Sequence, residues 1–241
     1  MTKLLTLVYG IISYIAFFVI FLYSIGFVGN FIVPKSIDSG PEDTAIISAI
    51  IVNVILLSVF ALQHSIMARP AFKRWWTRFI PTAIERSTYV LLSSLALALI
   101  FCFWQPITGV IWSVENPVGT QIINIVFWMG WLIVLLSTFM INHFDLFGLR
   151  QVYLEFKEKE YTSLGFKNPW FYQYVRHPIM TGFIIAFWAT PHMTVGHLLF
   201  SVVTTLYIMV ALQFEEHDLV QYFGDEYRDY KKRVSMLFPL K

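Results

Sequence analysis

Long apolar stretches separated by short polar ones dominate this chain. Four runs are long enough to cross a lipid bilayer, where about 20 residues are needed. They are residues 4–28, 44–67, 88–104 and 122–144. A fifth apolar region, 179–214, is too long for one crossing and is interrupted at Pro191. Because proline breaks the helical hydrogen-bond ladder, this region predicts a helical hairpin with a short arm of about 12 residues and a long arm.

The composition agrees with a membrane protein. Hydrophobic residues make up 57% of the 241 residues and charged residues only 13%, whereas soluble domains carry about 25% charged residues. Nothing is strongly basic, low in apolar content or periodic in glycine, so nucleic-acid-binding, disordered and collagen-like proteins are excluded. We therefore predict an all-α membrane bundle of four full spans plus a C-terminal hairpin.

Positive charges are distributed unevenly among the predicted loops. Sixteen of the 17 Lys and Arg residues fall before the first span, between spans two and three, in 145–178 or after 214, and Lys35 alone falls on the other side. Cytoplasmic loops are enriched in Lys and Arg. We therefore expect both termini in the cytoplasm.

We expect one integrated domain with two parts. Residues 1–144 form the N-terminal transmembrane helices, and residues 145–241 form a cytoplasmic loop, the hairpin and a tail. The mixed charges of 155–170 predict a short amphipathic helix followed by a loop. The long arm is expected to leave the membrane, break near Gly224 and resume as a helix.

Arg176, His177 and Pro178 stand where the cytoplasmic loop re-enters the membrane. Pro178 suits the first helical turn, and an Arg and a His before a helix N-terminus can receive a carboxylate or phosphate. The alternative is an arginine that reaches the headgroups and a histidine that caps the helix.

Glu215 and Glu216 stand where the long arm should emerge on the same side. Because the hairpin doubles back, these carboxylates can meet Arg176 and His177. The alternative is the solvated end of a helix, although ionisable groups near an apolar core are functional candidates.

Three further residues could accept a proton. His143 lies near Asp145 in the sequence, and such a carboxylate could hold the imidazole in one tautomer. His64 is expected at the same membrane level. Each could equally mark the membrane boundary or satisfy backbone groups.

Two sequence motifs of known binding sites are absent from the chain. No Gly-x-Gly occurs, so the dinucleotide fingerprint and a glycine-rich phosphate loop are excluded. The six histidines include no pair at the i+3 or i+4 spacing that presents two metal ligands on one helix face. We predict no metal site.

The ordered motifs Arg176-His-Pro-x-x-x-Gly182, Glu215-Glu216 and Phe223-Gly-x-x-Tyr-x-x-Tyr230 resemble the isoprenylcysteine carboxyl methyltransferase superfamily of membrane methyltransferases. The matched stretch covers the last part of the chain, from 172 to 239. The segments Gln63-His64-Ser65, 143–151 and 187–191 look more like the bacterial methanethiol S-methyltransferase branch.

The resemblance implies a bacterial inner-membrane enzyme that uses S-adenosylmethionine, with its active site on the cytoplasmic side. The donor's carboxylate suits Arg176, and its amino or ribose groups suit Glu215 or Glu216. Met180 stands where superfamily members often have Tyr, which leaves a packing role. The implied donor-site residues are Tyr174, Arg176, His177, Pro178, Met180, Gly182, Glu215, Glu216, Gly224, Tyr227 and Tyr230.

The reaction implied is methyl transfer to a small thiol, methanethiol, to give dimethyl sulfide. The thiolate is the nucleophile, so a base is useful, and the candidates are His143 or Asp145 with His64 as second choice. Alternative acceptors are an isoprenylcysteine carboxylate or a phospholipid amine. An alternative of another class is a haem-binding isomerase or transport protein with His64 or His177 as axial ligand.

Overall fold

Helices dominate the structure, a computed structural model that describes residues 2–40 and 45–239. In these ranges, five helices are long and apolar enough to cross a membrane, which confirms the predicted all-α membrane class. The start predicted for the second span, Thr44, lies outside the described residues. The five helices are α1 (Lys3–Gly29), α2 (Ile46–Ala68), α4 (Thr82–Phe103), α5 (Pro117–Ile141) and α9 (Val195–Phe223).

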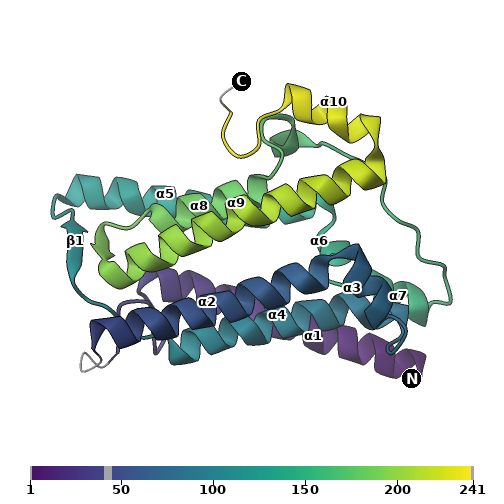
Figure 1. Cartoon of the computed structure of the whole chain (residues 1–241), viewed down its shortest axis with the longest axis horizontal. Helices are drawn as coiled ribbons and strands as arrows, with labels where there is room; N and C mark the ends of the chain where they lie inside the picture. The colour runs from purple at the N-terminus through teal and green to yellow at the C-terminus, as the bar shows by residue number, and fades with distance from the viewer. Residues whose placement is uncertain (1, 41–44, 240–241) are drawn as a thin grey trace. The chain divides into compact units, whose positions relative to one another are not determined.

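Shorter elements connect these helices (Figure 1). They are α3 (Pro70–Trp76), α6 (His143–Leu146), α7 (Leu149–Phe156), the 3-10 helix η1 (Trp170–Gln173), α8 (Pro178–Trp188) and α10 (Asp225–Arg233), with strands β1 (Val110–Ser113) and β2 (His192–Thr194).

The chain forms two compact units. The N-terminal unit comprises the chain up to Ile107 together with Asn142–Ser163. The C-terminal unit comprises Thr108–Ile141 and the chain from Leu164 onwards. Helix α5, which lies within 1–144, therefore belongs with the hairpin.

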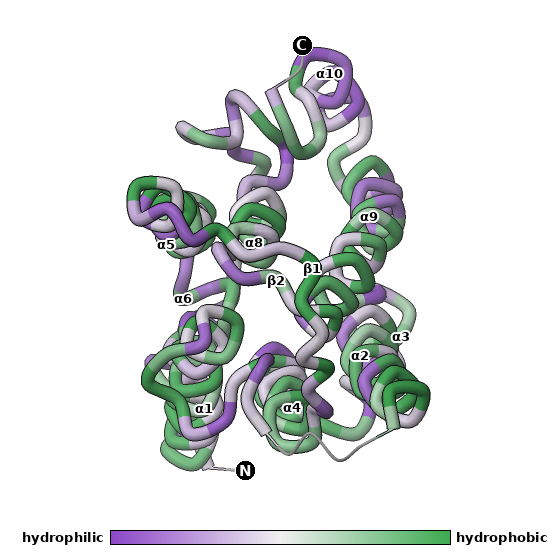
Figure 2. Tube along the Cα trace, turned by 90° about the vertical axis from the view of Figure 1, so that its left-hand side faces the viewer, coloured by the Kyte–Doolittle hydropathy of each residue, from purple (hydrophilic) through white to green (hydrophobic). Residues whose placement is uncertain are grey.

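In the N-terminal unit, α4 lies between α1 and α2, as the end-on view in Figure 2 shows. Helix α7 folds back along α1. A Cβ atom on Gly10 would lie 2.5 Å from Val152, so only glycine allows this close approach. The ammonium of Lys3 is 2.5 Å from the carboxylate of Glu158.

The amphipathic helix predicted at 155–170 is wrong in position, because the helix found here is α7. It begins after Gly148, whose φ of 87° favours glycine, and it ends at Phe156. Glu158 then adopts a φ of 57°, which turns the chain out of the helix.

In the C-terminal unit, α8 lies between α5 and α9 (Figure 2). The predicted hairpin is confirmed, with a short arm of 11 residues in α8 and a long arm of 29 residues in α9. Helices α5 and α8 touch through glycines, since a Cβ atom on Gly182 would lie 2.6 Å from the Gly130 carbonyl oxygen. The antiparallel pair β1 and β2, which the sequence analysis does not predict, joins the far ends of these helices.

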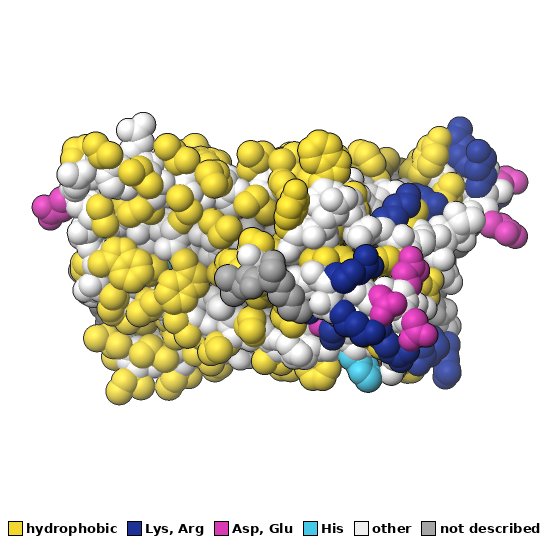
Figure 3. All heavy atoms as spheres, turned by 90° about the horizontal axis from the view of Figure 1, so that it is seen from above, with side chains coloured by type: hydrophobic (Ala, Val, Ile, Leu, Met, Phe, Trp, Pro, Cys, Tyr) yellow, Lys and Arg dark blue, Asp and Glu magenta, His cyan; other side chains and the backbone are white. Residues whose placement is uncertain are grey.

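The long arm breaks where predicted. Helix α9 ends at Phe223, Gly224 adopts a φ of 63°, and α10 follows. Helix α10 is hydrophilic (Figure 2). On the face shown in Figure 3, charged side chains gather mainly at one end, and hydrophobic side chains cover most of the rest. This contrast is typical of a helix bundle whose polar end lies outside the lipid.

Candidate active site

The segment before α8 is fixed by the C-terminal tail. The backbone N–H of Arg176 donates to the Ser235 carbonyl at 2.8 Å, and that of His177 donates to the Met236 carbonyl at 3.1 Å. The Thr181 hydroxyl donates to the Leu237 carbonyl at 2.6 Å. The tail therefore lies alongside the start of α8 and holds both basic residues in place.

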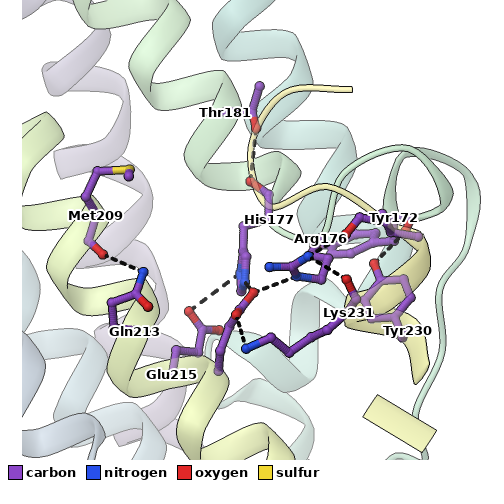
Figure 4. Close-up of polar contacts among 11 residues, drawn as sticks. Tyr172, Arg176, His177, Thr181, Met209, Gln213, Glu215, Tyr230 and Lys231 are labelled. Carbon is purple, nitrogen blue, oxygen red and sulfur yellow. Dashed lines mark hydrogen bonds and ion pairs between the residues drawn. The ribbon is translucent and has the colours of Figure 1, made fainter. Parts of the chain in front are cut away.

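A buried carboxylate joins three basic side chains (Figure 4). Arg176 Nε donates to Glu216 Oε1 at 2.6 Å, and His177 Nε2 lies 3.1 Å from the same oxygen. Lys231 Nζ lies 2.7 Å from Glu216 Oε2. The side chain of Glu216 is only 2% exposed. The expected meeting of the two hairpin arms is thus present, and we name Arg176, His177, Glu215, Glu216 and Lys231 the ion cluster.

Arg176 also binds the polypeptide backbone. Its Nη1 donates to the carbonyl of Lys231 at 3.3 Å and to that of Val234. The guanidinium therefore links α9, α10 and the tail. Since its side chain is 7% exposed, these contacts are shielded from water.

Two members of the ion cluster are accessible. The Glu215 side chain is 47% exposed, and its Oε2 lies 3.8 Å from His177 Nδ1. The Lys231 side chain is 38% exposed. In Figure 4 these two side chains approach the cluster from α9 and α10. A carboxylate and an ammonium are thus available to a zwitterionic ligand.

Three aromatic side chains, which we name the aromatic wall, pack together beside the ion cluster. Tyr227, Tyr230 and Phe166 pack edge to face, with ring centroids 5.1 to 5.8 Å apart. The Tyr230 hydroxyl donates to the Tyr172 carbonyl, and burial raises the pKa of Tyr230 to about 12. This phenol is therefore neutral at physiological pH.

The hydroxyl of Tyr227 is buried and has no hydrogen-bond partner among the described residues. Burial, followed by the nearby Glu216 carboxylate, raises the pKa of Tyr227. An unpaired buried hydroxyl costs free energy. A polar ligand beside the ion cluster would satisfy it.

The other five predicted donor-site residues pack against neighbours, are exposed or set the backbone conformation. Gly182 faces α5, and Pro178 occupies the first turn of α8. Met180 packs against the apolar cluster that contains Leu212 and Leu237. Tyr174 is 67% exposed. A side chain on Gly224 would meet nothing within 4 Å, so its positive φ explains the glycine.

His143 lies in the N-terminal unit, buried beside Tyr14. The Tyr14 hydroxyl is 2.8 Å from His143 Nε2, and the rings of Phe144 and Phe147 surround the imidazole. Burial lowers the pKa of His143, so the imidazole is neutral at pH 7 and able to accept a proton.

The carboxylate of Asp145, expected to orient His143, accepts hydrogen bonds from Arg150 and Tyr161. Its Oδ1 accepts from Arg150 at 2.9 Å, and its Oδ2 accepts from the Tyr161 hydroxyl at 3.3 Å. These bonds fix the loop after α7, because Arg150 also donates to the Thr162 carbonyl.

His64 is surrounded by hydroxyl groups. The Tyr89 hydroxyl is 2.9 Å from its Nε2, and the Ser93 hydroxyl is 3.1 Å from its Nδ1. The imidazole stacks on Phe60. Both ring nitrogens therefore face hydroxyl groups, which is a poor arrangement for an axial haem ligand.

Sequence reasoning missed Lys231, Tyr172 and Tyr14. Lys231 lies four residues after Tyr227, on the same face of α10, and that spacing could have revealed it. The carbonyl of Tyr172 and the hydroxyl of Tyr14 act through contacts between distant parts of the chain, 58 and 129 residues apart. No local pattern encodes such contacts.

Comparisons with known proteins place the chain in one protein family. The NnrU protein family matches residues 52–236. Methanethiol S-methyltransferase of Mycobacterium tuberculosis is 57% identical over 239 residues, 99% of this chain and 98% of that protein. The protein of that name from Crocosphaera subtropica is 55% identical, covering 99% and 93%. Methanethiol S-methyltransferase 2 of Bradyrhizobium diazoefficiens is 56% identical, covering 98% and 91%. No solved structure matches the chain.

Proposed function

The chain belongs to the NnrU protein family, and from this premise we propose that it transfers a methyl group from S-adenosylmethionine to methanethiol, producing dimethyl sulfide. The observation that carries the proposal is identity of 48 to 57% over nearly the full chain to relatives named methanethiol S-methyltransferase. The ion cluster and the aromatic wall support it, because they offer contacts to a zwitterionic amino acid and to an adenine ring.

The donor site consists of residues of the C-terminal unit. The ion cluster binds the amino acid moiety of the donor, and the unpaired hydroxyl of Tyr227 binds a polar group of the nucleoside. Aromatic faces attract a cationic sulfonium. Tyr174, Pro178, Met180, Gly182, Gly224 and Tyr230 shape this site around the cluster.

The donor supplies an electrophilic methyl group: the acceptor sulfur bonds to the methyl carbon as the bond from that carbon to the sulfonium sulfur breaks. The thiol proton passes to a base or to water. An alkyl thiol is mostly protonated at neutral pH. His143 is the first candidate for the base because its imidazole is neutral, and Asp145 and His64 follow.

The protein is an integral membrane protein. We place it in the bacterial inner membrane with the donor site on the cytoplasmic side. The distribution of Lys and Arg supports this orientation, since 16 of 17 fall in segments of one side.

The test uses the purified full chain in lipid nanodiscs with methanethiol and S-adenosylmethionine that carries a deuterated methyl group. Headspace mass spectrometry should detect dimethyl sulfide that contains the label, and the Glu216→Gln variant should produce far less. Labelled isoprenylcysteine ester or labelled phospholipid amine, without labelled dimethyl sulfide, would contradict the proposed acceptor. A visible absorption band of the purified protein would favour haem.

A further inference from the structure

The guanidinium of Arg176 is already engaged within the protein. Its Nε binds Glu216, and its Nη1 binds two backbone carbonyls, those of Lys231 and Val234. A bidentate clamp on a ligand carboxylate uses Nε with Nη2, or both Nη atoms, so it would displace at least one of these bonds and leave Glu216 without its arginine partner or a backbone carbonyl without its donor. Such unpaired groups are costly. Arg176 is therefore better suited to positioning the cluster than to clamping a ligand.

The ammonium of Lys231, unlike the guanidinium of Arg176, is accessible and has donors available. It is held by Glu216 Oε2 at 2.7 Å, yet its side chain is 38% exposed. A lysine ammonium has three N–H donors, and the structure shows one acceptor for Lys231 among the described residues. The bond to Glu216 holds the cation in a fixed place while further donors are available to a ligand.

The nearby Glu215 provides the opposite charge. Its side chain is 47% exposed and faces His177 at the same cluster. The exposed Lys231 ammonium and the exposed Glu215 carboxylate lie around the buried part of the ion cluster. They complement a zwitterionic amino acid, whose carboxylate can bind Lys231 and whose ammonium can bind Glu215.

We propose that Lys231 binds the carboxylate of the donor's amino acid moiety, with Glu215 binding its ammonium, and that Arg176 is a positioning residue. This assignment rests on the proposed function. It departs from the expectation that the arginine fork binds that carboxylate.

The test compares two ligands that differ in the amino acid moiety. S-adenosylhomocysteine contains it, whereas 5′-methylthioadenosine retains the adenosine and thioether but lacks it. Calorimetric titration of the full chain in detergent should show that Lys231→Met weakens S-adenosylhomocysteine binding about 10-fold to 150-fold, as expected for a charge-assisted hydrogen bond. Binding of 5′-methylthioadenosine should change less than about threefold.

The adjacent Lys232 gives a matched control. Its side chain is 75% exposed and lies 2.8 Å from Asp229, away from Glu216. Lys232→Met should bind both ligands as the wild type does. Lys231→Arg, which keeps the charge, should recover most of the S-adenosylhomocysteine affinity.

Equal losses for both ligands in Lys231→Met would show a structural role and overturn the assignment, as would unchanged binding of S-adenosylhomocysteine. A wild-type chain that binds neither ligand would overturn the proposed function together with this assignment. Wild-type binding with an insensitive Lys231→Met variant would overturn the assignment alone.

Discussion

The two units place different kinds of polar group inside their helices. The spanning helices of the N-terminal unit bury pairs of neutral groups, such as Tyr89 with His64 and Asn53 with the backbone of Gln105. The C-terminal unit instead buries an ionised carboxylate with an arginine and a lysine. The N-terminal unit also has an ion pair, Arg150 with Asp145, but those side chains are 22% and 18% exposed, against 7% and 2% for Arg176 and Glu216.

The cost of removing charge from water explains this difference. Isolated ions cost far more to bury than neutral polar groups, and ionisable groups at membrane depth are rare. The 29 residues of α9 span about 44 Å, longer than a hydrocarbon core of about 30 Å. Glu216 lies near the end of this helix, where burying a charge costs less free energy than in the hydrocarbon core. The buried charge of the C-terminal unit therefore goes with a helix long enough to extend beyond the lipid.

The largest effect is expected from Glu216→Gln, which removes the charge that the ion cluster shares. Breaking a buried ion pair costs about 3 to 5 kcal/mol because the partner charges stay buried. Thermal unfolding in detergent should show a large loss of stability, accompanied by a loss of S-adenosylhomocysteine binding. Asp229→Asn, at an exposed pair on α10, is the control and should melt as the wild type does. Equal melting of both variants would show that the buried charge of Glu216 does not stabilise the C-terminal unit.

A smaller loss is expected from Gly182→Val at the contact between α5 and α8. Its side chain would meet the Gly130 carbonyl and Val134, and overpacking of this kind costs about 1 to 3 kcal/mol. Unfolding temperatures of the variant and of Gly165→Ala, which has nothing within 4 Å, measure the effect. If the valine variant were as stable as the alanine variant, close glycine packing would not hold the hairpin.

The buried His143 of the N-terminal unit predicts a modest sensitivity to acid. Burial lowers the pKa of His143 below that of the unfolded chain, about 6.5, so the unfolded state binds more protons between the two values. Stability should therefore fall as the pH drops below about 6.5. Melting curves from pH 8 to pH 5 should show a smaller decline for His143→Gln. An identical decline in both proteins would assign the effect to other groups.

The smallest effect is expected for Lys3→Met. The Lys3 ammonium and the Glu158 carboxylate lie 2.5 Å apart, and this hydrogen bond lowers the pKa of Glu158. Both side chains are exposed, and exposed pairs contribute little to stability. The melting temperature should stay within error of the wild type, and a clear drop would show that this pair holds α7 against α1.

The hairpin and the meeting of Arg176 with Glu216 were predictable because apolar length and Pro191 determine where the chain turns. The contribution of Lys231 was predictable only in part: its spacing from Tyr227 puts both on one face of α10, but the direction of α10 depends on the backbone angles of Gly224. Strand β1 has four exposed residues and therefore no alternating pattern that would predict it. The partner of His143 comes from α1, so neither sequence distance nor periodicity indicates it.

The segment 235–237 ties the start of α8 to a part of the chain at least 56 residues away. Its three carbonyls accept from Arg176, His177 and Thr181. A proteolytic cut after Arg233 would remove these bonds and leave both hairpin arms in place. Such a cut should therefore loosen the basic residues of the ion cluster without removing either helix that carries the cluster.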